Sequence, residues 1–357
     1  MVTTKEPHVN PLSEDWLPQL EKDIPLFHQL GINTICVSHT DPTQSPERAL
    51  QLLHDAGIYV LLELFTNIDR KNLSNRTPAN EIDLESLYSP VKIRKNFATV
   101  QQTAHFSNLL GYTISQSIIW DSSSTKLVAL HRAAVRDTKF FLRKLGVSRH
   151  IPVGASMSSN QQFRLPALQY MTAGSLEERV DFMSFGVYDW IGPSSFQISG
   201  WKNLVEAFER FPVPIFWGEY GTAYPGRKRL LDEVDCLYSP DMTGVVSGGF
   251  LQTFGGTDRP APVGRDDDSD EDDDDDEGGY DLVRFESDGA RTPKPNFAVY
   301  QQKLAAMYGK PSSEVVGHHE MKDYENWRGQ FEPNPRFWTA EPEDVPDFPL
   351  DWDQVLG

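Results

Sequence analysis

The sequence contains few cysteines and no long apolar segment. Cys36 and Cys236 are the two cysteines among 357 residues, and they lack the paired spacing of a metal site. No run of eighteen apolar residues occurs, so no transmembrane segment is predicted. The first residues, MVTTKEPHVNPLSEDW, lack the apolar centre of a secretory signal, and the end, DFPLDWDQVLG, lacks the hydrophobic tail of a lipid anchor. Taken literally, these absences predict a cytoplasmic location.

Positive charge is also scarce. Lys and Arg number 33 against 52 Asp and Glu, which gives a net charge of −19, but Asp266–Glu277 alone holds eleven acids and leaves −8 for the rest. No compensating basic face is apparent, so nucleic-acid binding is not expected. The acidic run repels itself and predicts a disordered insertion over residues 258–279, with a contact to a basic partner or a cation as the alternative.

Buried strands and amphipathic helices alternate along the chain. Seven strands are predicted, at Ile32–Val37, Ile58–Phe65, Leu109–Ile119, Ile151–Ala155, Phe182–Val187, Val213–Glu219 and Gly249–Phe254. Helices are predicted at Asn10–Leu30, Pro46–Ala56, Pro90–Phe106, Lys126–Leu145, Glu177–Val180, Lys202–Phe211 and Phe297–Met307. This alternation is typical of βαβ units around a parallel sheet. An eight-stranded barrel needs one more strand.

The stretch Val213–Thr222, VPIFWGEYGT, is the centre of the pattern. Its apolar run reads as a strand buried on both faces, and Glu219 falls where the strand ends. A carboxylate at the carboxyl end of a parallel barrel strand lies where such folds keep their chemistry. The alternative is a glutamate that caps the strand end or forms a salt bridge.

Seven blocks of sequence carry a family resemblance. They are DPT at Asp41–Thr43, DAGIYV, AAVRDTK, IPVGAS, YDWIGPSSFQISGW, PVPIFWGEYGT and LYSPDMTGVVSGG at Leu237–Gly249. In this order the chain resembles the fungal β-1,3-glucanosyltransferases of glycoside hydrolase family 72. The resemblance implies a (β/α)8 TIM-like barrel over residues 10–310, preceded by an amino-terminal remnant, 1–9, and followed by an irregular extension, 311–357.

The amino-terminal remnant is too short for the first strand of the family. That strand is therefore expected to be absent or replaced, either by the amino-terminal residues or by Ser313–Val316. An open edge in a parallel barrel would be a liability. A misassigned start of the chain is the rival explanation.

The resemblance also implies the catalytic residues. The family breaks and rejoins β-1,3-glucan through a glycosyl-enzyme ester, and such retaining chemistry needs a nucleophilic carboxylate and an acid/base carboxyl. Glu219 matches the nucleophile. A gap-free count from Gly111 to Lys139 places the Asn and the acid/base Glu on Gln116 and Ser117. A serine hydroxyl cannot supply and recover a proton as a tuned carboxylic acid does.

The rest of the family's pocket is partly retained. The third-strand Asp appears as Glu63, the second-strand Arg and Tyr as Cys36 and Ser38, and the eighth-strand Tyr as Gln252 or Phe254. The predicted substrate-binding residues are Tyr188, Trp190, Tyr220, Gln116 and Glu63. The aromatic residues Tyr188 and Trp190 either stack on a sugar ring or pack in the core.

Two further sets of residues are candidates for chemistry. Asp121 is a candidate substitute acid or an ordinary loop aspartate. His39 and His54 have no second ligand at metal spacing and read as structural, so neither a metal nor a cofactor is expected.

The family's cysteines are missing as well. The resemblance places them at Ala49, Ala173, Ile191 and Thr222, with the last two positions paired in a disulfide. Their joint absence is the expected state of a protein in a compartment where disulfides do not form.

Two functions follow from this pattern. The leading hypothesis is a degenerate glucanosyltransferase relative that binds β-glucan or another carbohydrate, or serves as a scaffold or a repurposed protein, with Ser117 at the acid/base position. The alternative is an active β-1,3-glucan transglycosylase or hydrolase that uses Glu219 with a displaced acid. A small-molecule enzyme in the old cleft is a third possibility, without a cofactor motif to support it.

Overall fold

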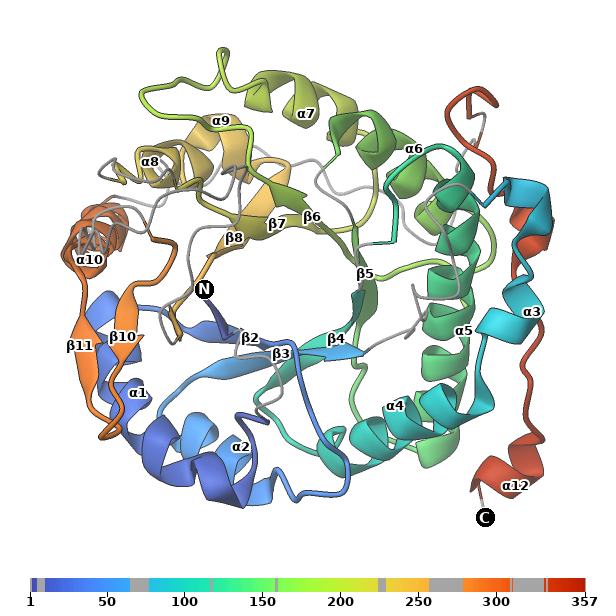
Figure 1. Cartoon of the computed structure of the whole chain (residues 1–357), viewed down its shortest axis with the longest axis horizontal. Coiled ribbons are helices and arrows are strands. Elements are labelled where there is room, and N and C mark those ends of the chain that lie inside the picture. The colour runs from blue at the N-terminus through green and yellow to red at the C-terminus, as the bar shows by residue number, and fades with distance from the viewer. Residues whose placement is uncertain are drawn as a thin grey trace, which may run out of the picture.

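The chain folds into a closed barrel of parallel strands with helices around it. The computed structural model describes residues 2–4, 10–64, 77–115, 118–157, 160–223, 229–256, 279–308, 310, 331 and 333–356. Neighbouring strands pair in sequence order from β1 to β8, and the ring closes between β8 and β1 (Figure 1). The strands are β1 (Val2–Thr4), β2 (Thr34–Val37), β3 (Tyr59–Leu64), β4 (Leu109–Ser115), β5 (Val153–Met157), β6 (Met183–Val187), β7 (Ile215–Tyr220) and β8 (Val246–Leu251). The predicted (β/α)8 architecture is confirmed.

The amino-terminal residues supply the first strand. Val2 lies opposite Ile35 of β2 and Thr4 lies opposite Val37, while Val2 also pairs with Leu251 of β8. The amino terminus accordingly lies beside β2 and β8 in Figure 1. Of the two replacements that the sequence left open, the structure uses this one; the other, residues 313–316, falls outside the described residues. The barrel therefore keeps eight strands.

The hydrophobic core has an outer and an inner part. Trp217 of β7 is fully buried and packs in the outer part against Trp201 and Phe208 of α7 (Trp201–Phe208), with ring centroids 5.8 and 6.5 Å away. The inner cluster consists of Cys36, Leu61, Phe182, Phe216 and Phe250. Because alternate residues of a strand point to opposite faces, these side chains fill the barrel below its carboxyl end.

Helices surround the strands. They are α1 (Leu17–Leu30), α2 (Glu47–Asp55), α3 (Leu84–Leu87), α4 (Pro90–Thr103), α5 (Val128–Leu145), α6 (Gln161–Thr172), α7, α8 (Glu233–Leu237), α9 (Pro240–Thr243), α10 (Pro295–Tyr308) and α12 (Trp352–Leu356). Helix α12 lies outside the others (Figure 1). Helix α6 was not predicted from the sequence and carries Pro166 in its interior. The helix predicted at 177–180 is wrong, because Glu178 and Arg179 both donate backbone hydrogen bonds to the Ser175 carbonyl in an isolated turn.

A small three-stranded sheet lies outside the barrel beside α1 (Figure 1). It contains β9 (Gly255–Gly256), β10 (Val283–Phe285) and β11 (Arg291–Pro293). A buried ion pair, Arg291 Nε to Asp23 Oδ1 at 2.6 Å, ties this sheet to α1. The predicted acidic insertion, 258–279, falls between β9 and β10 and lies outside the described residues except for Gly279.

The carboxyl-terminal segment packs along the outer face of the helical ring (Figure 1). Trp338 is 2% exposed, and the Tyr170 hydroxyl of α6 donates to the Glu341 carbonyl at 3.1 Å. Further along, Trp352 stacks on Phe348 at 3.8 Å between ring centroids and on Phe97 of α4 at 5.7 Å. Described residues from Phe331 onward, largely irregular as expected, therefore add to the outer core.

Candidate active site at the carboxyl end of the barrel

Glu219 is the carboxylate around which the carboxyl end of the barrel is built. It is the penultimate residue of β7, half-buried, and lies opposite Gly186 of β6 after a register shift. The preceding Gly218 has no room for a side chain, because a Cβ there would lie 2.9 Å from the hydroxyl oxygens of Ser156 and Ser184. The Ser156 and Ser184 side chains therefore favour glycine at this position, directly before Glu219.

Tyr188 and Gln252 meet Glu219 from the two neighbouring strand ends. The Tyr188 hydroxyl donates a hydrogen bond to Glu219 Oε2 at 2.7 Å. It also contacts the side-chain oxygen of Gln252, which directly follows β8. Burial, reinforced by the Glu219 charge, raises the pKa of Tyr188 far above its ordinary value. Tyr188 therefore keeps its proton and remains a donor to the carboxylate.

Two buried arginines hold the backbone around this cluster. Arg164 of α6 donates to the Gly186 carbonyl at 3.1 Å and pairs with Asp189 at 2.7 Å. Arg229 donates to the Gln252 carbonyl and to the Tyr280 carbonyl, both at 2.8 Å. Burial lowers the pKa of Arg229. Neither arginine was predicted from the sequence.

A second carboxylate, Glu63, lies at the same edge of the barrel. Glu63 is half-buried near the carboxyl end of β3, and the Cys36 thiol of β2 donates to its Oε1 at 3.7 Å. Because β3 and β7 run in parallel, the ends that carry Glu63 and Glu219 face the same mouth. The mouth therefore offers acidic groups from two strands.

The structure decides which eighth-strand residue joins the site. Gln252 contacts Tyr188, whereas Phe254 is 1% exposed and packs on Phe27 of α1 with ring centroids 4.7 Å apart. Of the two candidates for the position of the family's eighth-strand Tyr, Gln252 is therefore the one that lies at the mouth of the barrel.

Two predicted binding residues lie elsewhere. Trp190 is 6% exposed and packs on Trp201 at 5.1 Å between ring centroids. Tyr220 is fully buried, with its hydroxyl 3.2 Å from that of Tyr300 on α10. Core packing, the alternative that the sequence left open for Trp190, describes both side chains, and the geometry gives no support to a stacking role for either.

The predicted acid/base position is not among the described residues. Gln116 and Ser117 follow β4 and lie outside the described residues. The candidate substitute Asp121 accepts a hydrogen bond from the Ser124 backbone amide at 2.8 Å and so closes a turn before α5. Among the described residues, no group of three or more His, Cys, Asp or Glu side chains is arranged to hold a metal ion.

The positions of the family's cysteines carry other contacts here. Thr222, three residues after Glu219, donates from Oγ1 to the Tyr188 carbonyl at 3.1 Å, while Ile191 is 56% exposed. Neither Cys36 nor Cys236 forms a disulfide, and burial raises the pKa of Cys236 to about 12. A hydrogen bond thus joins the two segments that the resemblance links by a disulfide.

The fold and the mouth define a (β/α)8 barrel with carboxylates at the carboxyl ends of two strands. The glucanosyltransferase family model, glycoside hydrolase family 72, matches residues 3–276. The chain belongs to this family, as the resemblance predicted.

Characterised relatives and solved structures agree with this assignment. The 1,3-β-glucanosyltransferase gel1 of Aspergillus fumigatus is 36% identical over 234 residues, which make up 66% of this chain and 49% of the relative. The 1,3-β-glucanosyltransferase gas4 of Schizosaccharomyces pombe is 32% identical over 242 residues, 66% of this chain and 50% of the relative. This chain thus spans about half the length of these relatives.

The solved structures show the same fold. Gas2p of Saccharomyces cerevisiae, solved as a mutant in complex with laminaritetraose and laminaripentaose, has a TM-score of 0.75 at 24% identity, with 97% of this chain and 70% of that chain covered. A complex of ScGas2 with another compound has a TM-score of 0.76 at 24% identity, over 99% of this chain and 72% of that chain.

The predicted cytoplasmic location is wrong. It rested on segments that the sequence lacks, and the family assignment overturns it, because the 1,3-β-glucanosyltransferases of this family are extracellular or surface-anchored enzymes. Missing cysteines are a weak guide to compartment when other contacts replace them, as the Thr222 hydrogen bond does. Within the described ranges, no helix combines the length and the apolar character needed to cross a bilayer.

Proposed function

We propose that this protein binds 1,3-β-glucan chains at the carboxyl end of its barrel and that its transfer of natural glucan is strongly impaired. The observation that carries the proposal is the pairing of Glu219 with Tyr188 at 2.7 Å, at the strand end where the resemblance places the nucleophile. A carboxylate held by a protonated tyrosine is oriented to attack the sugar's anomeric carbon. The laminari-oligosaccharides bound in the related structure support the ligand class.

The proposed impairment comes from Ser117 at the acid/base position. Cleavage of a glucan linkage leaves an alkoxide that must receive a proton as the bond breaks. Serine does not donate that proton at neutral pH. Loss of a general acid lowers rates by about 10²–10⁴-fold.

The glucan site with its nucleophile and the impaired transfer can be tested separately. A sugar donor whose leaving group needs no proton tests the nucleophile, and a natural oligosaccharide tests binding and transfer. With 2,4-dinitrophenyl β-laminaribioside, Glu219 displaces a stable phenolate and forms an ester to the anomeric carbon. We expect a mass increase of one laminaribiosyl unit on the intact protein, absent from Glu219→Gln. With laminaripentaose, we expect binding by calorimetry and slow or undetectable elongation. If neither the mass increase nor the binding occurs, the proposed site and ligand are wrong.

Restoring the acid gives a complementary measurement. The double variant Ser117→Glu with Gln116→Asn rebuilds the family's pair and is expected to raise the elongation of laminaripentaose above that of the wild-type protein. Formation of the glycosyl-enzyme from the activated donor needs no proton for the leaving group and should change less. A matched variant, Ser123→Glu, adds a carboxylate to the turn before α5 and serves as the control.

The alternative function is an active transglycosylase with a displaced acid, and Glu63 is the residue that favours it. Its carboxyl lies at the same barrel edge as Glu219, next to the Cys36 thiol. If the wild-type protein elongates laminaripentaose rapidly and Glu63→Gln abolishes this while still reacting with the activated donor, the alternative holds and the proposed impairment is overturned.

A further inference from the structure

We infer that Arg164 is a positioning residue, which fixes the turn after β6 so that the Tyr188 hydroxyl reaches Glu219. The inference rests on the proposed function, because it assigns Arg164 a role in the site built around Glu219. Arg164 contacts the Gly186 carbonyl before Tyr188 and the Asp189 carboxylate after it.

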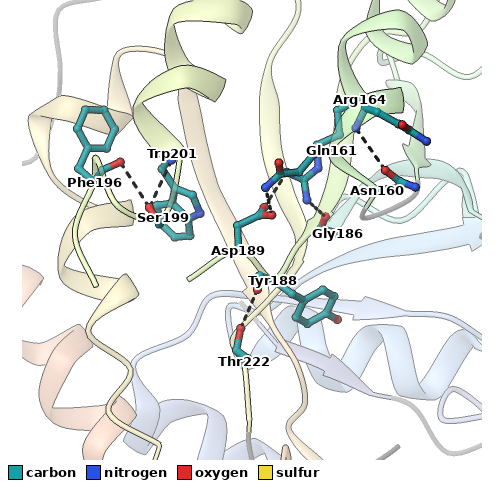
Figure 2. Close-up of polar contacts among 11 residues, drawn as sticks. Asn160, Gln161, Arg164, Gly186, Tyr188, Asp189, Phe196, Ser199, Trp201 and Thr222 are labelled. Atoms are coloured by element: carbon teal, nitrogen blue, oxygen red, sulfur yellow. Dashed lines mark hydrogen bonds and ion pairs between the residues drawn. The ribbon is translucent and has the colours of Figure 1, made fainter. Parts of the chain in front are cut away.

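The guanidinium of Arg164 bridges the two flanks of Tyr188. Arg164 is 1% exposed on α6. Its Nη1 lies 2.7 Å from Oδ2 of Asp189, the residue that follows Tyr188 in the sequence. Its Nη2 donates at 3.1 Å to the carbonyl of Gly186, two residues before Tyr188. Figure 2 shows Arg164 and Gln161 meeting Asp189, with Gln161 donating to the other carboxylate oxygen. The turn is thus tied to one helix at two points.

A separate tie joins the same turn to the end of β7. Thr222 Oγ1 donates to the Tyr188 carbonyl at 3.1 Å, as Figure 2 shows. Thr222 lies three residues beyond Glu219, so the backbone of Tyr188 is held between α6 on one side and the Glu219 segment on the other. Small displacements of Arg164 are therefore transmitted to the distance between the Tyr188 hydroxyl and the carboxylate.

The two simultaneous contacts of Arg164, with the Gly186 carbonyl and the Asp189 carboxylate, require an arginine. Its planar guanidinium presents donors to two acceptors at once, whereas the ammonium of lysine is a single compact charge on a flexible stem. Arg164→Lys preserves the charge opposite Asp189 and sacrifices the simultaneous contact with the Gly186 carbonyl. This variant therefore alters position more than charge, and it avoids leaving Asp189 as an unpaired buried carboxylate.

A residue that merely holds α6 against the barrel would behave differently. Arg132 on α5 provides the comparison, since it is also buried, pairs with Glu178 at 3.1 Å and lies over the Tyr170 ring in the outer layer. Arg164→Lys and Arg132→Lys are both expected to lower thermal stability. Only the first is expected to affect the Tyr188 hydroxyl.

The first experiment is a double-mutant cycle on glycosyl-enzyme formation from 2,4-dinitrophenyl β-laminaribioside. We expect Arg164→Lys to lower the rate constant by about 10- to 100-fold with a smaller change in the donor concentration at half-saturation. Arg132→Lys should leave the rate constant unchanged. In the Tyr188→Phe background, Arg164→Lys should have little further effect, because its action passes through the missing hydroxyl. Multiplicative effects of the two substitutions would overturn the inference.

The second experiment does not depend on catalysis. In protein labelled with ¹³C at tyrosine Cζ, the Tyr188 signal is assigned by its loss in Tyr188→Phe. We expect Arg164→Lys to move this signal toward its position in Glu219→Gln, and Arg132→Lys to leave it in place. An unmoved signal in a folded Arg164→Lys protein would refute the positioning role. If the wild-type protein neither forms a glycosyl-enzyme nor binds laminaripentaose, the proposed function fails, while this spectrum still decides the role of Arg164.

Discussion

The Tyr188 hydroxyl lies 2.7 Å from Glu219 Oε2, and it joins the end of β6 to the end of β7 at the mouth of the barrel. This hydrogen bond is partly shielded, since both side chains are half-buried. A hydrogen bond to a charged acceptor is stronger than one between neutral groups. The relationship therefore both orients the carboxylate and offsets part of the cost of placing its charge in the barrel.

Tyr188→Phe tests the importance of this hydrogen bond directly. The variant keeps the ring and removes the donor, so a loss of about 1.5–3 kcal/mol of stabilisation of the reacting carboxylate is expected. The rate of glycosyl-enzyme formation from the activated laminaribioside should fall by about 10- to 150-fold. Tyr300→Phe is the matched control, because its hydroxyl contacts that of Tyr220 in the outer core. Equal rates in Tyr188→Phe and the wild-type protein would contradict the assigned role.

Gly221→Ala is predicted to disturb the other side of the site. Gly221 has a φ of 101°, and a Cβ there would lie 2.0 Å from Arg229 Nη2, which holds the Gln252 carbonyl. Strain and overlap together should lower the free energy of unfolding by about 2–5 kcal/mol. Binding of laminaripentaose should weaken as Arg229 moves away from Gln252.

Gly57→Ala separates strain from overlap in that measurement. Gly57 has a φ of 72°, and a Cβ there would meet no atom within 4 Å. Its substitution should cost about 1–2 kcal/mol in urea unfolding and leave the calorimetric affinity unchanged. Identical effects of the two substitutions on stability and on affinity would show that the contact with Arg229 is unimportant.

Strands β2, β5 and β6 were predictable because they are buried on both faces. The continuous apolar run before Glu219 and the glycine after it place the carboxylate at a strand end, and Glu219 indeed lies at the end of β7. The periodicity failed beyond the strand ends. Gln252 and Phe254 share the parity of one strand face, yet β8 ends at Leu251, and the chain turns so that their side chains separate.

The two arginines near the site had no local signal. Arg164 lies in a helix that contains a proline, and its partners Gly186 and Asp189 follow by more than twenty residues. Arg229 similarly contacts Gln252 and Tyr280 far along the chain. A charged residue ordinarily predicts an exposed position, and its burial depends on acceptors that sequence periodicity does not identify.

The buried histidine of α5 gives a prediction about pH. His131 is fully buried, and burial lowers its pKa to about 3 from an ordinary value near 6.5. Between these two values the unfolded chain binds a proton that the folded protein does not. The stability contribution of a neutral His131 is therefore complete above pH 6.5 and declines as the pH falls, by about 1.4 kcal/mol per pH unit.

His131→Leu removes this proton uptake. Neither ring nitrogen of His131 has a hydrogen-bond partner within the described part of the chain, so an apolar side chain of similar size should be tolerated. The free energy of unfolding is measured by urea titration from pH 7 to pH 4. As the pH falls, it should decrease less in the variant than in the wild-type protein. His105→Leu, at an exposed position, should follow the wild-type curve. Parallel curves for His131→Leu and the wild-type protein would disprove the prediction.

The carboxyl-terminal segment is predicted to contribute to the stability of the barrel through Trp338. This side chain is 2% exposed, with its ring centroid 5.8 Å from Tyr170 of α6, and its Nε1 donates to the Ala340 carbonyl at 3.0 Å. The next residue, Thr339, donates to the Ser122 carbonyl at 3.0 Å, in the turn that leads from β4 to α5. The segment thus packs on two elements of the barrel's outer layer.

Truncation of Trp338 should therefore destabilise the whole domain. Trp338→Ala leaves a cavity between the segment and α6, and urea unfolding should show a loss of about 3–5 kcal/mol. The adjacent Phe337 is 42% exposed, so Phe337→Ala should change the free energy of unfolding by less than about 1 kcal/mol. If Trp338→Ala unfolds with the same midpoint as Phe337→Ala, the segment rests on the barrel without stabilising it.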